Sequence, residues 1–439
     1  GLWDVIMIVI GGIIGSGIFL SPSEIAVAVP YPILVIAVWV VGGMFSFFGA
    51  VSFAELGAAM PQAGGIYIYL REAYGPLISF LFGWTLFLVI DSGSIATLAV
   101  AFSHNMLPKF VAMTPLGMKF VAAAFVLFLG FVNFVGVRWG AWLQNILTVI
   151  KMGAIGIIVI VVFFFAKNQG HLRNFVEPKP DNFNFGMLGA FGVALVASLW
   201  AYKGWEAATY SAGETKNPEK NLPLGILIGT IAVIAFYILA NLAYMYVLPV
   251  DKIASSEGRV ALDAMRLITG EFGASLIAFL ILFSILGAAN QNMLTSPRVY
   301  YAMAQDGLFF KKVAEVHPKF LTPHISIIAI TAWSIVLTLT GSFKQLFTYV
   351  IFGEWIFFGL TVASVIILRK KLPNLPRPYK TWGYPVTPII FVLAAIYVAV
   401  GSLLSAFTNA LAGLLIICLG IPAYLYWNGK LKKANTAKS

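Results

Sequence analysis

Long apolar runs, separated by short polar or Pro/Gly-containing segments, dominate the chain from its first residues to near its end. A membrane-spanning helix needs about 20 predominantly apolar residues, and the period-two alternation of an outer-membrane barrel is absent from these runs. The pattern therefore predicts an all-α polytopic membrane protein with about 12 spanning helices. The predicted spans are 3–29, 32–57, 76–106, 117–136, 140–166, 187–212, 222–248, 271–303, 325–341, 345–369, 387–406 and 409–428.

The first span is unusually rich in glycine. The stretch "IVIGGIIGSGIFLSP" places Gly11, Gly12, Gly15, Ser16 and Gly17 within seven positions. A glycine inside a helix costs about 1 kcal/mol relative to alanine. Close packing against another helix is one interpretation, for which Gly11 and Gly15 have the right spacing. The other interpretation is that the helix is interrupted here.

The sixth span favours the second interpretation. In "ALVASLWAYKGWEAATYSAGE", Tyr202, Lys203 and Gly204 interrupt an apolar run, and Glu206 follows. The two interruptions lie about 190 residues apart, each in the first span of a five-helix block. Such paired interruptions indicate a transporter binding site, because unwound backbone at membrane depth must be satisfied by a ligand or by a water-filled cavity.

The ends of interrupted helices predict what such a site binds. The half-helix after the first break would present the N–H groups of Ser16 and Gly17 and the Ser16 hydroxyl to a carboxylate. The carbonyls of Ile13, Trp200 and Lys203 would suit an ammonium. Backbone groups alone would then recognise the zwitterionic head of an α-amino acid.

Composition and charge support this class. The 439 residues are 60% hydrophobic and 10% charged, too few charges for a soluble protein of this size. The net charge of +11 does not indicate nucleic acid, because the cations lie in loops, mainly 298–319 and 369–380, and in the tail after 429. An even number of spans puts these segments on one side, so both termini should be cytoplasmic.

Residues for catalysis or cofactor binding are not apparent in the sequence. Its four histidines have no metal-ligand spacing, and we find no catalytic triad, metal cluster or phosphate-binding loop. We therefore expect neither an enzyme nor a bound metal or cofactor. The single cysteine, Cys418, excludes an intrachain disulfide.

Four segments resemble one family over essentially the whole chain. "IIGSGIF", "FAELGAAMPQAGGIYIYLREAYG", "NQNMLTSPRVYYAMAQDGLFF" and "RPYKTWGYP" are similar to motifs of the amino acid–polyamine–organocation (APC) superfamily, and within it the L-type amino acid transporter branch. The resemblance implies a LeuT-like five-plus-five inverted repeat with two extra C-terminal helices. The corresponding division is repeat 1 at 1–166, repeat 2 at 187–370, two helices at 387–428 and a cytoplasmic tail at 429–439.

The resemblance also implies alternating access and assigns site residues. Trp200 matches an aromatic gate over the substrate, and Tyr237 resembles a tyrosine that braces the broken helices; ordinary aromatic packing is the alternative for both. The residues expected at the substrate are Ile13, Gly15, Ser16, Gly17, Trp200, Ala201 and Lys203.

Lys151 stands in the middle of span five, where an unpaired charge costs several kcal/mol. Snorkelling to an interface is one interpretation. The other is that its ammonium takes the place where sodium-driven relatives of this fold bind a cation, with Gly12 or Gly15 carbonyls and Asn292 as partners. That arrangement argues against sodium coupling but leaves proton coupling open, because a desolvated lysine can lose its proton.

Lys203 and Glu206 are three residues apart and could pair across one helical turn. Alternatively, Glu206 faces the substrate side chain or bridges to another helix. The chain departs from the family at two points: a small residue is common where Lys203 stands, and the loop between spans three and four lacks the cysteine that links animal members to a single-span glycoprotein. We therefore expect no disulfide-linked heavy-chain subunit, as in bacterial members, and the cell membrane of a bacterium as the location.

The sequence thus predicts a sodium-independent exchanger of small neutral L-amino acids such as alanine, serine or threonine, because the bulky Trp200 narrows the cavity. One alternative is a proton-coupled or cationic amino acid carrier in which Glu206 supplies the charge. A channel or a transport-like receptor is the alternative from another class.

Overall fold

The computed structural model describes residues 1–166, 169–179, 185–340, 343–405 and 407–436, and every regular element among them is helical. Residues 341 and 406, the predicted ends of two spans, and 437–439 of the predicted tail lie outside the described residues. The longer helices are α1 (Leu2–Ile13), α2 (Gly17–Ala28), α3 (Pro32–Ala59), α5 (Pro76–Thr85), α6 (Asp91–Val100), α7 (Pro115–Val135), α8 (Val137–Phe165), α9 (Phe185–Ala201), α10 (Pro218–Val247), α12 (Val260–Thr295), α14 (His324–Thr340), α15 (Phe343–Lys371), α16 (Val386–Ser405) and α17 (Phe407–Thr436).

The predicted polytopic all-α architecture is confirmed. Ten described helical segments are long and apolar enough to cross a membrane. The shorter apolar α14 and the 29-residue α15 account for the two remaining predicted spans. The interruptions of the first and sixth spans are also present, between α1 and α2 and after α9.

The eighth span differs from its prediction of 271–303. Its helix α12 begins at Val260, changes direction at Gly270 (φ 68°), and is followed by the separate short helix α13 (Pro297–Gln305). Hydropathy missed the first turns because they carry charges. Arg266 lies 2.9 Å from the Asp263 carboxylate and 2.6 Å from that of Glu271, so these charges satisfy one another on the helix surface.

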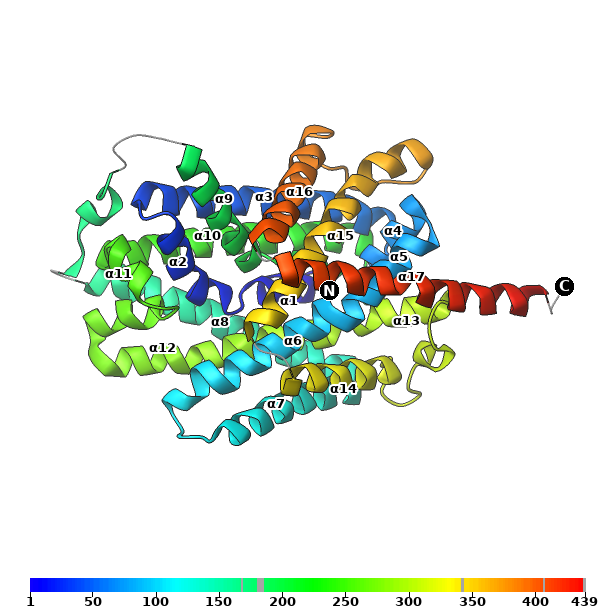
Figure 1. Cartoon of the computed structure of the whole chain (residues 1–439), viewed down its shortest axis with the longest axis horizontal. Helices are drawn as coiled ribbons and strands as arrows, with labels where there is room; N and C mark the ends of the chain where they lie inside the picture. Colours follow the sequence, from blue (N-terminus) through cyan, green and yellow to red (C-terminus); the bar gives the residue numbers. More distant parts are fainter. Residues whose placement is uncertain (167–168, 180–184, 341–342, 406, 437–439) are drawn as a thin grey trace.

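The helices form a bundle whose two ends are easily distinguished (Figure 1). The long helices α3 and α10 pack against each other, as do α8 and α12, along the long axis of the molecule. The short helix α4 (Ile66–Tyr74), α13 and the C-terminus lie toward one end, and α11 (Val250–Ser255) lies at the other. We refer to the first of these as the α4 end.

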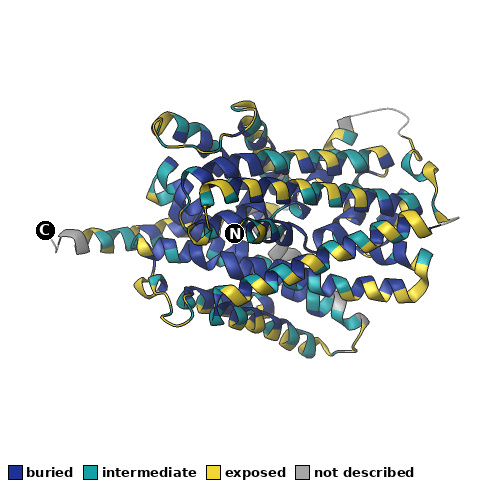
Figure 2. Ribbon diagram, turned by 180° about the vertical axis from the view of Figure 1, so that it is seen from behind, coloured by how far each residue is buried: buried dark blue, intermediate teal, exposed yellow. Residues whose placement is uncertain are grey.

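Burial follows the pattern expected for a membrane protein. Inward faces are buried, whereas exposed residues line the outer faces of the peripheral helices (Figure 2). Many of these exposed residues are large and apolar, among them Phe128, Ile160, Phe164 and Leu393. Exposed apolar surface on this scale is rare in soluble monomers and is suited to contact with lipid.

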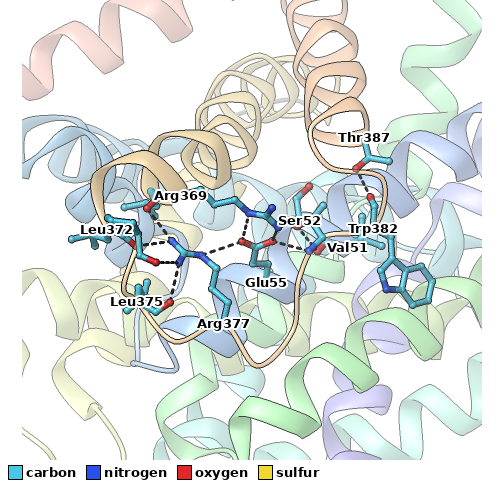
Figure 3. Close-up of polar contacts among 12 residues, drawn as sticks. Val51, Ser52, Glu55, Arg369, Leu372, Leu375, Arg377, Trp382 and Thr387 are labelled. Atoms are coloured by element: carbon cyan, nitrogen blue, oxygen red, sulfur yellow. Dashed lines mark hydrogen bonds and ion pairs between the residues drawn. The ribbon is translucent and has the colours of Figure 1, made fainter.

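Toward the α4 end, Glu55 of α3 is the centre of an ion-pair cluster (Figure 3). Its buried carboxylate accepts hydrogen bonds from Arg369 at 2.6 and 2.9 Å and from the Thr381 N–H at 2.7 Å, and it pairs with Arg377 at 3.4 Å. Arg377 also donates to carbonyls at the end of α15, including that of Leu372 at 2.9 Å. The Glu55 cluster, defined as Glu55, Arg369, Arg377 and Thr381, therefore ties the "RPYKTWGYP" segment to α3 and α15.

A second set of contacts joins two other characteristic segments. Asp306, after α13, accepts hydrogen bonds from Arg71 at 2.6 Å and from the Tyr67 hydroxyl at 2.7 Å, both on α4. Burial alone would lower the pKa of Arg71, but the hydrogen bonds and charges of Asp306 and Glu72 outweigh it and raise the pKa. Three of the four characteristic segments, all except "IIGSGIF", thus contact one another at the α4 end of the bundle.

Candidate functional site

The first interruption leaves backbone groups available in the centre of the molecule. Helix α1 ends at Ile13, Ile14 is extended (φ −71°, ψ 94°), and α2 begins at Gly17. The Ser16 carbonyl accepts the N–H groups of Phe19 and Leu20. Among the described residues, neither the Ser16 nor the Gly17 N–H donates a backbone hydrogen bond. The break therefore presents free donors at the start of a half-helix, where the helix dipole favours an anion.

Ser16 adds a third donor to this set. Its hydroxyl is buried and has no hydrogen-bond partner among the described residues. A buried polar group without a partner costs about 1–3 kcal/mol, so in a native site it indicates that a ligand or water completes the arrangement.

The second interruption touches the first directly. After α9, Tyr202 and Lys203 leave the helix, Gly204 adopts φ 130°, and a 3₁₀ helix runs from Trp205 to Glu214. A Cβ on Gly204 would lie 2.4 Å from the carbonyl carbon of Gly12. Only glycine allows this combination of positive φ and backbone approach. The two breaks therefore meet backbone to backbone.

A cavity lies at the junction of these breaks. All seven residues predicted at the substrate line it, as does Asn292, whereas Lys151, Glu206 and Tyr237 lie outside its lining. The lining residues are Gly12, Ile13, Gly15, Ser16, Gly17, Ser94, Thr97, Leu98, Trp200, Ala201, Lys203, Gly204, Ala288, Gln291 and Asn292.

Sequence reasoning missed the walls contributed by α6 and α12. Ser94, Thr97 and Leu98 of α6 line the cavity, as do Ala288 and Gln291 of α12. Ser94 and Thr97 are three residues apart, on one face of a helix that also carries Asp91 and Ser92. That spacing of polar residues was the available signal for α6.

Tyr237 contacts both interruptions through its hydroxyl group, from outside the cavity. Its hydroxyl is buried and lies within hydrogen-bond distance of the Ile13 carbonyl, at 2.8 Å, and of the Ala201 carbonyl, at 3.1 Å. One side chain of α10 thus contacts the last residue of α1 and the last residue of α9. It positions cavity-lining backbone without lining the cavity itself.

Lys151 of α8 is fully buried, and its ammonium donates to the Gly11 carbonyl at 2.6 Å. The expected partners, Gly12 or Gly15 and Asn292, are therefore wrong for the hydrogen bond that the described residues show. The Gly15 carbonyl instead accepts from Ser284 of α12 at 3.0 Å. Gly287 of α12 leaves room for the Lys151 side chain, because a Cβ there would lie 2.5 Å from its Cε. Lys151 thus joins α1, α8 and α12.

Of the alternatives left open for Lys203 and Glu206, pairing across one helical turn is wrong. The Lys203 ammonium lies 2.8 Å from the Glu354 carboxylate of α15 and donates to the Ser94 hydroxyl at 3.2 Å. The Glu206 carboxylate instead accepts the Gly204 N–H at 3.0 Å. The two side chains therefore have different hydrogen-bond partners. Glu354 was not predicted, because it lies far along the chain.

Comparison with known proteins agrees with this geometry. The family model described as "Amino acid permease" matches residues 1–422. The chain is similar to the human "b(0,+)-type amino acid transporter 1", with 33% identity over 99% of this chain and 90% of that protein. It is 32% identical to the Bacillus subtilis "Serine/threonine exchanger SteT", over 99% of this chain and 97% of that protein.

A third relative is the mouse "Large neutral amino acids transporter small subunit 2", with 32% identity over 99% of this chain and 82% of that protein. The match to the family model and the full-length similarity to transporters agree with the interrupted helices and the cavity between them. The chain belongs to the amino acid permease family and, within the APC superfamily, to its L-type amino acid transporter branch.

Proposed function

We propose that this chain is a sodium-independent exchanger of small neutral L-amino acids such as alanine, serine and threonine, working by alternating access. The observation that carries the proposal is the set of unpaired donors at the first break. The N–H groups of Ser16 and Gly17 and the buried Ser16 hydroxyl border the cavity. They match a carboxylate, and the carbonyls at Ile13, Trp200 and Lys203 would receive the α-ammonium.

Neutral side chains are favoured by the charges around the cavity. Glu206, the carboxylate that a cationic carrier would need, bonds to the Gly204 N–H and does not line the cavity. Lys203 does line it, and its charge is balanced by Glu354. Trp200 and Leu98 add bulk to the walls, which favours small substrates. In this proposal Trp200 is the gate, and Asn292 borders the substrate from α12.

Sodium independence is supported by Lys151. Its ammonium donates a hydrogen bond to the Gly11 carbonyl between α1, α8 and α12. We infer that this positive charge takes the place of the bound sodium ion in sodium-driven relatives of the fold. The two five-helix blocks, 1–166 and 187–370, would form the inverted repeats, since each begins with an interrupted helix. Residues 387–428 would add two helices outside the repeats.

We further propose that the chain works in the cell membrane of a bacterium without a disulfide-linked subunit. Its one cysteine, Cys418, lies in α17, and the segment between α6 and α7 has none. The basic segments toward the α4 end and in the tail support a cytoplasmic position for both termini.

Counterflow in proteoliposomes tests the function. Vesicles preloaded with alanine, serine or threonine should accumulate the labelled amino acid from outside, equally well with and without sodium. Vesicles without internal amino acid should accumulate little. Uptake into empty vesicles that requires a proton gradient would replace exchange with proton coupling. Conductance without saturation would indicate a channel, and binding without counterflow would indicate a receptor.

A further inference from the structure

The Lys203 side chain extends from the second break toward α15. Its side chain is 13% exposed, and its ammonium lies 2.8 Å from Glu354 of α15 and 3.2 Å from the hydroxyl of Ser94 on α6. Lys203 and Ser94 both line the cavity. The side chain therefore begins where the substrate head is proposed to bind and ends beside the Glu354 carboxylate and the Ser94 hydroxyl; we call these surroundings of the ammonium the recess.

This recess holds more acidic groups than basic ones. Asp91, Glu206 and Glu354 are all buried, and each lies within electrostatic range of Lys203. Lys203 is the one cation that these three groups share among the described residues. Tyr210 lies within electrostatic range of all three carboxylates, and Tyr300 lies within electrostatic range of Asp91.

Such a recess is a strong site for a cation. Charges interact far more strongly in a poorly hydrated interior than in water, and carboxylates buried without a partner are costly. The Lys203 ammonium satisfies this requirement with one ion pair and one hydroxyl acceptor. It therefore stands where the ammonium or guanidinium of a cationic substrate side chain would otherwise bind.

We propose that Lys203 is a built-in occupant of a cation subsite, and that its presence excludes amino acids with cationic side chains from the cavity. The proposal rests on the amino acid transport proposed above and names the residue that sets its charge selectivity. A second cation entering the recess would meet the Lys203 ammonium and be repelled. Discrimination of this kind uses an unfavourable contact with the wrong substrate in addition to favourable contacts with the right one.

The test is a gain of function in Lys203→Ala. Shortening this side chain opens the recess to the cavity and leaves Glu354 without its partner. Unlabelled diaminobutyrate, ornithine, lysine and arginine compete with labelled alanine in counterflow. These competitors differ in the length of their cationic side chains. A charge-assisted hydrogen bond corresponds to about tenfold or more in affinity. We expect at least one cationic competitor to gain about tenfold in potency relative to unlabelled alanine.

Two matched variants assign the gain to charge. Lys203→Arg keeps a cation in the recess and should gain nothing. Adding Glu354→Gln to Lys203→Ala removes the acceptor and should reverse most of the gain. A Lys203→Ala protein that exchanges alanine but still rejects every cationic competitor would overturn the proposal. So would a gain that survives the Glu354→Gln change.

Wild-type protein provides a test that does not depend on the variants folding. Cationic amino acids should compete at least about tenfold more weakly than alanine, and equal potency would contradict the role of Lys203. If Lys203→Ala folds but does not transport, arginine should raise its thermal unfolding temperature more than alanine does; no difference would count against the subsite. Absence of exchange by the wild type with any amino acid would instead refute the proposed function.

Discussion

At the scale of single residues, the glycines in and beside the first break differ in the atoms that they pack against. Gly12 lies against the backbone of Gly204, and Gly17 against that of Ala201. Gly11 lies beside side chains of α8: a Cβ there would be 2.2 Å from atoms of both Gln144 and Thr148. Close helix packing, one of the two interpretations of the sequence, is thus correct for Gly11, and interruption is correct for residues 14–16, between α1 and α2.

Gly17→Ala should abolish substrate binding, whereas Gly15→Ala should be tolerated. A Cβ on Gly17 would lie 2.7 Å from the Cα of Ala201, so the two breaks would have to separate. On Gly15 it would lie 3.4 Å from the Ala288 Cβ, close to ordinary contact. Substrate-induced thermal stabilisation of the purified variants measures the difference. Equal losses in both variants would mean that the glycines serve only general packing.

Lys151→Ala should reduce counterflow at least about tenfold while leaving a monodisperse protein. The change removes the bond to the Gly11 carbonyl and the packing against Gly287, so one of the contacts that join α1, α8 and α12 is lost. Initial rates in proteoliposomes measure the effect. Lys119→Ala, at an exposed lysine of α7, is the control and should keep the wild-type rate. Wild-type uptake by Lys151→Ala would contradict the proposed role.

Residue-level prediction succeeded for backbone groups and failed for long side chains. Ser16 and its neighbours could be placed because a break in one helix and its donors are local properties of the chain. The partners of Lys151 and Lys203 depend on helices distant in sequence. For Lys203, spacing suggested Glu206, but the structure provides Glu354 because α15 passes beside the break.

At the scale of elements, apolar length predicted the spans well and their internal geometry poorly. The start of α12 carries charges that pair with one another, so hydropathy excluded turns that are nevertheless helical. The third span contains π-helical turns at 86–90 and 101–106. Such changes of helix type depend on packing against neighbours, which a count of apolar residues does not contain.

Glu55→Gln should lower the thermal unfolding temperature of the protein. The change removes a buried charge that holds Arg369, Arg377 and the Thr381 N–H, and each charged hydrogen bond contributes about 1.5–3 kcal/mol. Unfolding in detergent, followed by fluorescence, measures the shift. Glu315→Gln alters an exposed carboxylate and should leave the temperature unchanged. An equal temperature for Glu55→Gln and wild type would show that the cluster does not stabilise the α4 end.

At the scale of the whole molecule, the distribution of charge predicts orientation. The sequence supplied the number of spans and the basic loops, and these suffice for sidedness because the rule depends on counts rather than on packing. The closeness of the two breaks could be expected from their corresponding positions in two five-helix blocks and from the family resemblance. Their exact contact required the structure, since it joins residues about 190 positions apart.

Cysteine labelling tests the orientation. In a Cys418→Ser background, Lys312→Cys lies in an exposed segment after α13, and Arg173→Cys lies in an exposed segment before α9. A membrane-impermeant thiol reagent should label Lys312→Cys only in inside-out vesicles and Arg173→Cys only in right-side-out vesicles. The reverse pattern would place both termini outside the cell, contrary to the proposal.

The contact between Gly12 and Gly204 has a mechanical consequence. A side chain between two moving helices acts as a soft spring, because its rotamers absorb small displacements. Two backbone segments in direct contact have no rotamers that could absorb a displacement. A rotation of one interrupted helix should therefore displace the other by nearly the same amount. The two interrupted helices should therefore move together. In the alternating access proposed above, this contact would keep the spacing between the proposed carboxylate-binding and ammonium-binding groups fixed while the site opens toward either face of the membrane.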